Sequence, residues 1–155
     1  MPVNAVIEEK FNHSLFCKLG QLGLLGVTVP EAYGGAAFDA TAACIVHEEL
    51  AAADPAFCLS YLAHSLLFVN NLARNGNHEQ KLRFLPDACE GKLIGGMGMS
   101  EPGAGTDVLG MRAFATKDGS DFVLNGNAHR QAAVCQHEAL RCCGEHIWRS
   151  RSRVR

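Results

Sequence analysis

The stretch "MGMSEPGAGTDVLG", residues 97–110, gathers the residue types most suited to binding chemistry. Glycines such as Gly103 and Gly105 permit positive φ and present backbone N–H groups without a side chain in the way. Ser100 and Thr106 add hydroxyl groups. Together these groups suit a flat heteroaromatic ring or a phosphate, which amide nests and hydroxyls recognise. An ordinary glycine-rich turn remains the alternative at this point.

The run does not match the common nucleotide-binding loops. No GK[ST] follows it, so it is not a Walker loop, and it is not a GxGxxG that follows a strand and opens a helix. The class of ligand therefore has to be inferred from the helices and strands that surround residues 97–110 in the sequence.

Helical patterns precede the run. Leucines at helical spacing predict a helix through "SLFCKLGQLGLLG", weakened at Gly20 and Gly23. Asp39 is placed to cap a helix that stops at Asp54-Pro55. The next segment, "AFCLSYLAHSLLFVNNLARNG", is apolar almost all round, which predicts a buried central helix. A capping box of Asn77 and Gln80 opens the last helix, which Pro86 should kink or end.

The pattern changes near Leu93. "KLIGGMGM" predicts a glycine-diluted strand, and "MRAFATKDGSDFVLNG" predicts a hairpin around Asp118-Gly119. The expected fold is therefore α+β by content and mainly α. Residues 1–92 form an all-α domain, 93–127 the start of a β-barrel domain, and 128–155 an unmatched tail.

Composition supports a folded chain. Of 155 residues, 48% are hydrophobic and 19% charged, so the chain can bury a core. No apolar run is expected to be long enough to span a bilayer, and the N-terminus resembles neither a secretory signal nor an organellar presequence. The seven cysteines form no CxxC pair and are typical of a reduced intracellular protein.

The charge changes sharply near Asn127. Residues 1–127 carry a net −6, whereas 128–155 carry +4, with six Arg and no Lys. This break predicts that 128–155 is an out-of-frame or alternative reading, or a disordered terminus. Its Cys135, His137, Cys142, Cys143 and His146 are zinc-ligand types, but their spacing fits no closed site. Its alternating arginines predict a solvated end rather than a nucleic-acid site.

The run 97–110 resembles the first signature of the acyl-CoA dehydrogenase family. The fixed places of that signature are filled by Gly98, Met99, Ser100, Glu101, Ala104, Gly105, Thr106, Asp107 and Gly110. "LGLLGVTVPEAYGG", "EELAAADPAFCLSYLAHSLL" and "RNGNHEQKLRFLP" resemble the family's helical domain in the same order. "LSYLAHS" with "RNGN" is most similar to the isovaleryl-CoA dehydrogenase branch, and the resemblance covers roughly residues 9 to 127, with the family's first helix missing.

The resemblance implies an FAD enzyme that introduces an α,β double bond into a short branched acyl-CoA in leucine catabolism. Ser100 would donate to the flavin ring. Glu101 and Asp107 would fix the loop by accepting backbone N–H bonds. Thr106 would contact the FAD pyrophosphate and face the acyl-CoA substrate. The implied cofactor-binding residues are Met97, Gly98, Met99, Ser100, Gly105 and Thr106.

The resemblance also implies partners and a location. An electron-transfer flavoprotein would accept the electrons, a homotetramer would be the assembly, and the mitochondrial matrix would be the site, with the cytoplasm as the alternative. Nucleic acid, membrane and metal are not expected. The family's catalytic base lies beyond residue 155, so this chain is expected to be inactive and poorly soluble alone. The alternative is a non-catalytic helical interaction module or a truncated isoform that associates with the full-length enzyme.

Several other residues invite a chemical interpretation but are expected to be structural. His64 and Tyr61, on the apolar helix, are expected in the core, although His64 near a substrate channel stays open. Glu48-Glu49 is expected to be a surface pair, since adjacent helical residues diverge. Exposed positions are expected for His13, His47 and His78, and small core positions for Cys17, Cys44, Cys58 and Cys89.

Overall fold

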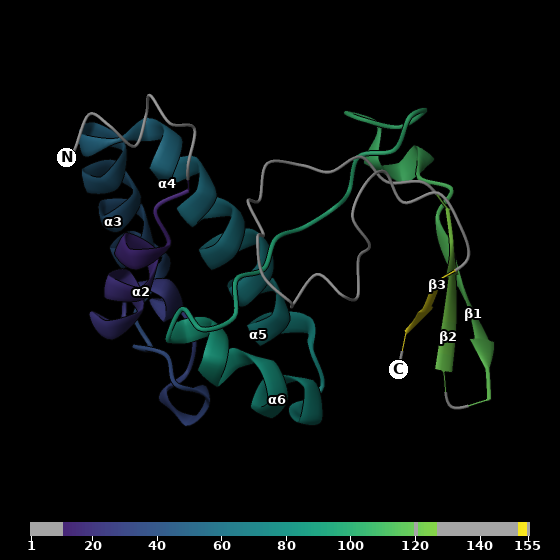
Figure 1. Cartoon of the computed structure of the whole chain (residues 1–155), viewed down its shortest axis with the longest axis horizontal. Helices are drawn as coiled ribbons and strands as arrows, with labels where there is room; N and C mark the ends of the chain where they lie inside the picture. The colour runs from purple at the N-terminus through teal and green to yellow at the C-terminus, as the bar shows by residue number, and fades with distance from the viewer. Residues whose placement is uncertain (1–10, 120, 127–151, 155) are drawn as a thin grey trace. The chain divides into compact units, whose positions relative to one another are not determined.

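The computed structural model describes residues 11–119, 121–126 and 152–154. The chain divides into two compact units, Met1–Gly95 and Gly96–Arg155 (Figure 1). The first unit is helical and the second contains a small sheet. This mainly helical content with an antiparallel sheet confirms the predicted fold class.

Local sequence signals define most helix ends in the first unit. Asp39 accepts the N–H of Ala42 at 3.0 Å. Asn77 and Gln80 form both bonds of the predicted capping box. The helical elements are α2 (His13–Gln21), η1 (Leu24–Gly26), η2 (Glu31–Tyr33), α3 (Ala40–Ala53), α4 (Pro55–Leu62), η3 (Ala63–Asn70), α5 (Asn71–Asn75) and α6 (His78–Cys89).

The elements α4, η3 and α5 run on as a single helix, Pro55–Asn75, whose middle segment η3 is a π-helix. Its 21 residues are long and apolar enough, by length and composition, to cross a bilayer, so the expectation that no apolar run reaches this length is wrong. A helix that forms the core of a globular unit meets the same criterion. Tyr61, His64 and Val69 are buried as predicted, whereas Leu59 is 55% exposed.

Two clusters of apolar side chains form the core of this unit. The rings of Phe16 and Phe57 meet edge-on with their centroids 6.1 Å apart, which joins α2 to α4. The first cluster comprises Phe16, Leu19, Leu25, Phe57 and Tyr61, and the second comprises Val29, Val69, Leu85, Ala88 and Cys89.

Helix α6 passes through Pro86 and ends at Cys89, so the helix does not end at the proline, which was one of the two expected outcomes. Proline removes one N–H, but burial of Leu85, Ala88 and Cys89 holds the last turn in place.

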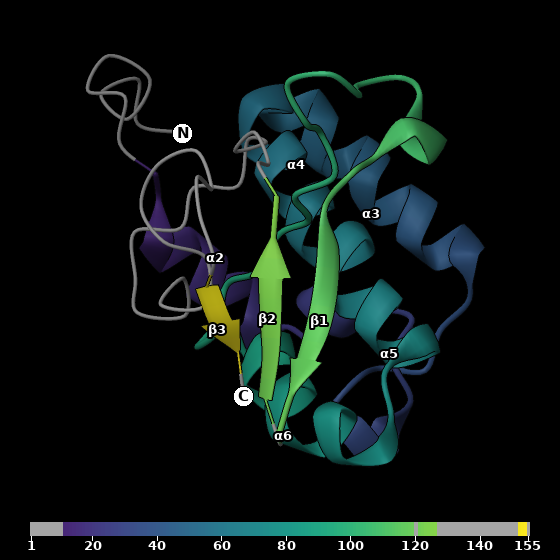
Figure 2. The same cartoon turned by 90° about the vertical axis from the view of Figure 1, so that its right-hand side faces the viewer.

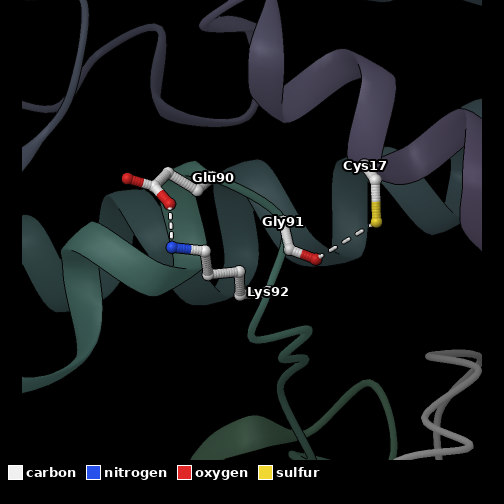
Figure 3. A network of polar contacts seen from close by, with 4 residues as sticks. All are labelled: Cys17, Glu90, Gly91 and Lys92. Atoms are coloured by element: carbon white, nitrogen blue, oxygen red, sulfur yellow. Dashed lines mark hydrogen bonds and ion pairs between the residues drawn. The ribbon is translucent and has the colours of Figure 1, made fainter.

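Helix α2 lies against the end of α6. A Cβ at Gly20 would overlap the carbonyl oxygen of Glu90, so only glycine allows this close approach. Figure 3 shows the Cys17 thiol donating to the carbonyl of Gly91 at 3.8 Å, beside an ion pair of Glu90 and Lys92.

The second unit holds an antiparallel sheet of β1 (Phe114–Asp118), β2 (Asp121–Asn125) and β3 (Ser152–Val154), in the order β1-β2-β3 (Figure 2). Phe114 pairs with Asn125 and Asp118 with Asp121, which confirms the predicted hairpin. Gly119 takes φ +64° in the turn, as a tight hairpin requires.

Two expectations differ from the structure here. The segment "KLIGGMGM" forms no strand within the described residues, because its glycines weaken an extended ladder. Residues 152–154 pair with β2 through the backbone, where a disordered terminus was expected. The tail's zinc-ligand types and the possible frame change lie outside the described residues.

Candidate functional site

A tight turn begins the candidate loop. Glu101 and Ala104 exchange two backbone hydrogen bonds of 2.9 and 3.1 Å, with Pro102 and Gly103 at the tip. Ala104 is 4% exposed, whereas Pro102 and Gly103 are exposed. The turn therefore has one buried anchor and a tip that faces outward.

The carboxylate of Glu101 closes the loop onto the start of the hairpin. Oε2 accepts the N–H of Arg112 and Oε1 accepts the N–H of Ala113, both at 2.8 Å. These two bonds, the Arg112 bond first, lower the pKa of Glu101 below its ordinary value. This confirms that Glu101 accepts backbone N–H bonds to fix the loop.

Asp107 organises the far end of the loop. Its Oδ1 accepts the N–H of Gly110 at 3.1 Å and caps the short turn Val108–Gly110. A Cβ at Gly110 would lie 2.6 Å from the Asp107 Oδ2, so this glycine accommodates the cap. Asp107 thus has the loop-fixing contact that was predicted for it.

Open space lies beside three glycines of the loop. A Cβ at Gly98, Gly103 or Gly105 would meet no atom within 4 Å among the described residues. Neither Gly103 nor Gly105 adopts positive φ, so the positive φ that glycine permits is not used at either position. What they provide is unobstructed backbone.

The remaining loop residues lie around this open backbone. Thr106 is exposed, and Met97, Met99 and Ser100 are half-buried. The backbone at Gly98, Gly103 and Gly105 is thus unobstructed by side chains, and the exposed Thr106 places a hydroxyl-bearing side chain next to it in the sequence.

His64 is a fully buried, hydrogen-bonded core residue, as predicted. Its Nδ1 accepts the N–H of Gly95 at 3.1 Å, so that nitrogen carries no proton, and Nε2 donates to the carbonyl of Ala88 at 3.0 Å. Burial lowers the pKa of His64 to about 4. The imidazole is therefore neutral at physiological pH.

Tyr61 is also a core residue, as predicted. It is 0% exposed and its hydroxyl donates to the carbonyl of Leu24 at 2.7 Å. Burial raises the pKa of Tyr61 to about 12, which makes proton transfer by this phenol unfavourable at neutral pH.

His47 was predicted to be exposed, and that prediction is wrong. Its Nδ1 donates to the carbonyl of Ala43 at 2.6 Å, and its ring centroid lies 4.7 Å from that of Tyr61. Its Nε2 is buried with no hydrogen-bond partner in the part of the chain that the structure describes. The helical spacing of Ala43, His47 and Leu50 was the signal that could have placed it on the packed side of α3.

His13 and His78 are exposed, as are Glu48 and Glu49, as expected. Among the cysteines, Cys58 and Cys89 are buried, and burial raises the pKa of both thiols, that of Cys89 to about 11. Cys17 is only half-buried. Cys44 is exposed, so its predicted core position is wrong, because α3 turns that face to solvent.

Comparison with known proteins identifies the family to which the chain is similar. Residues 2–92 match the sequence profile described as "Acyl-CoA dehydrogenase, N-terminal domain", which is more than half of the chain. The chain belongs to the acyl-CoA dehydrogenase family. Mitochondrial isovaleryl-CoA dehydrogenase of Pongo abelii is 47% identical over 110 residues, covering 71% of this chain and 26% of that protein. The enzyme of the same name from Solanum tuberosum is 45% identical over 114 residues, covering 74% and 28%.

Solved structures of acyl-CoA dehydrogenases share this fold. Glutaryl-CoA dehydrogenase from Mycobacterium smegmatis gives a TM-score of 0.74 at 33% identity, covering 82% of this chain and 33% of that one. An acyl-CoA dehydrogenase from Bacillus anthracis complexed with FAD gives 0.74 at 30% identity, covering 82% and 23%. The chain thus spans about a quarter to a third of the proteins that it resembles.

Proposed function

We propose that this chain is the flavin-loop-bearing N-terminal part of an FAD-dependent acyl-CoA dehydrogenase of the isovaleryl-CoA type. The observation that carries the proposal is the loop 97–107. Its glycine backbone is open, and Glu101 ties the loop to the start of the hairpin by accepting the N–H groups of Arg112 and Ala113, both at 2.8 Å. A braced loop with no side chains over its amides is preorganised for a flat, phosphate-bearing ligand.

In this proposal each loop residue binds or orients. Met97, Gly98 and Met99 border the flavin ring, and the Ser100 hydroxyl and N–H donate to it. Gly105 and Thr106 contact the pyrophosphate, and Thr106 also faces the acyl-CoA. Bound FAD would supply the oxidising centre that takes a hydride from the acyl chain. Donors aimed at the ring stabilise negative charge as it develops there.

The substrate class and pathway rest on the relatives. The relatives named isovaleryl-CoA dehydrogenase support a short branched acyl-CoA as substrate, and the word mitochondrial in their names supports a mitochondrial location. Leucine catabolism and the matrix are carried over from the family resemblance. The electron-transfer flavoprotein as electron acceptor and the homotetramer are likewise proposed from the family resemblance.

The chain alone is proposed to bind FAD without turning over substrate. Both carboxylates of the loop, Glu101 and Asp107, already accept backbone N–H groups and are not placed to take a proton from substrate. Within the loop, neither carboxylate is therefore proposed as the general base.

Titration of the purified 155-residue chain with FAD tests the proposal. Saturable quenching of flavin fluorescence is expected, and it should weaken in Thr106→Val but not in Thr41→Val, an exposed threonine of α3. Flavin that stays spectrally unchanged at high protein concentration would overturn the proposal.

A second candidate function is a helical interaction module, which exposed apolar side chains of the first unit favour. These side chains are Leu22 (71% exposed), Phe38 (64%), Ile45 (55%), Leu59 (55%) and Leu82 (50%). Exposed apolar side chains that form one contiguous patch are typical of a surface that another chain covers. Mixing the chain with a full-length dehydrogenase tests this, since mixed oligomers and lost activity are expected only if the module binds.

A further inference from the structure

We propose that His64 is a positioning residue that sets where the chain leaves the helical unit, so that the loop beginning at Met97 is preformed. The inference rests on the proposed function for the role of that loop in FAD binding. The hydrogen bond between His64 and Gly95 does not depend on that role. It starts from the two hydrogen bonds of a fully buried ring.

One imidazole joins two segments that are far apart from it in sequence. His64 donates to Ala88, in the last turn of α6, and accepts from Gly95, the last residue of the helical unit. Between these two points the backbone is held by bonds from Gly91 to Ala88 and from Leu93 to Asp87. The Gly95 bond extends this tether to two residues before Met97.

The neighbouring side chain Phe68 restricts the same point by packing. A Cβ at Gly95 would overlap the ring of Phe68, so the backbone there lies directly on the aromatic face. The rings of His64 and Phe68 are themselves 5.9 Å apart. One hydrogen bond and one close packing contact therefore fix Gly95 together.

Both side chains come from the π-helical segment η3. A π-helix is rare, and such segments within α-helices are frequently found at functional sites. The π-helical segment η3 supplies both His64 and Phe68, the two side chains that hold Gly95.

Two amide substitutions separate the two bonds of the ring. In His64→Asn the side-chain oxygen lies near the original Nδ1 and can still accept from Gly95, while the bond to Ala88 is lost. In His64→Gln the amide reaches the original Nε2 position and can still donate to Ala88, while the Gly95 N–H loses its acceptor. Because Asn is smaller than Gln and leaves the larger cavity, a general loss of core packing would affect His64→Asn more, which is the opposite of the order expected from the lost Gly95 bond.

Amide hydrogen exchange on the full chain, without flavin, tests the tether. His64→Gln is expected to speed exchange of Gly95 and of the hydrogen-bonded loop amides of Glu101, Ala104 and Gly110 by about tenfold relative to His64→Asn, as for one lost hydrogen bond. Equal exchange in the two variants, or no change in 97–110, would overturn the inference.

FAD titration then separates this inference from the proposed function. About tenfold weaker FAD binding is expected in His64→Gln than in His64→Asn. If the wild-type chain binds no FAD, the proposed function fails, but amide hydrogen exchange still tests whether His64 holds Gly95. If FAD binding is equal in both variants but exchange differs, His64 tethers Gly95 without preparing the loop, which also overturns the inference.

Should both variants unfold, the packing contact gives a second route. Gly95→Ala is expected to speed exchange in 97–110 by forcing Gly95 away from Phe68, and adding Phe68→Ala is expected to reverse this. Exchange that is unchanged in Gly95→Ala, or not reversed in the double variant, would contradict the inference.

Discussion

The carboxylate of Glu101 and the backbone of Ala113, twelve residues further along the chain, are joined by a hydrogen bond of 2.8 Å. The same carboxylate accepts the N–H of Arg112 at 2.8 Å. One side chain therefore closes the whole segment between the turn at Pro102 and the first strand. The shape of the candidate flavin loop depends on this closure.

Glu101→Gln is expected to loosen the loop, because an amide has one acceptor oxygen and no charge to hold two N–H groups. Faster amide exchange at Arg112 and Ala113 and weaker FAD binding, by about threefold to tenfold, are expected. Glu49→Gln, an exposed carboxylate on α3, is the matched control. Unchanged exchange at both amides would contradict the closing role.

The same contact predicts a pH dependence. Because the pKa of Glu101 is lowered in the folded chain, the unfolded state binds more protons at acidic pH. The stabilisation is therefore complete above the ordinary glutamate pKa and is lost as pH falls through the lower folded value. Exchange at Ala113 followed from pH 6 downward should accelerate beyond its intrinsic pH trend only in the wild type, not in Glu101→Gln.

His64 predicts a separate loss of stability in acid. Its pKa falls from 6.5 to about 4 on folding, so the unfolded chain binds the proton more readily between these values. The stabilisation is complete above pH 6.5 and is lost as pH falls toward 4, by about 3 kcal/mol at most. Urea unfolding across this range, compared with His64→Asn and with the exposed-site control His78→Gln, measures the effect. An equally steep pH dependence in His64→Asn would show that other groups cause it.

The helix ends could be predicted because their signals are local. Asp39 and the Asn77–Gln80 pair contact backbone N–H groups within three residues, so the sequence alone contains both partners. The family signature likewise placed acceptor roles at Glu101 and Asp107. The distant partners of Glu101, Arg112 and Ala113, were not contained in any local pattern.

The incorrect predictions concern positions where a neighbour distant in the sequence decides the outcome. His47 was misplaced because the ring that it contacts, Tyr61, belongs to the next helix. The helix continues past Pro86 because Leu85 and Ala88 are buried in the core, and this packing outweighs the tendency of proline to end a helix. The expected strand at Leu93 depended on a pairing partner, which local composition cannot supply.

Gly20→Ala tests whether packing outweighs helix propensity in α2. Propensity alone would stabilise an alanine in a helix interior by about 1 kcal/mol. The new Cβ would overlap the Glu90 carbonyl, however, and such overpacking costs about 1–3 kcal/mol. Net destabilisation in urea unfolding is therefore expected, with Gln21→Ala, an exposed position of the same helix, near neutral. A stabilised Gly20→Ala chain would show that α2 and the end of α6 do not approach this closely.

Gly105→Ala separates ligand access from stability in the loop. Gly105 has open space where the Cβ would go and no positive φ, so unfolding stability should change by no more than about 0.5 kcal/mol. The added methyl group would nevertheless stand over the amides that are proposed to meet the FAD pyrophosphate. Flavin titration should show weaker binding in Gly105→Ala and not in Gly103→Ala, which has the same open surroundings but no proposed ligand contact. Equal affinities in the two variants would mean that the cofactor does not approach the loop at Gly105.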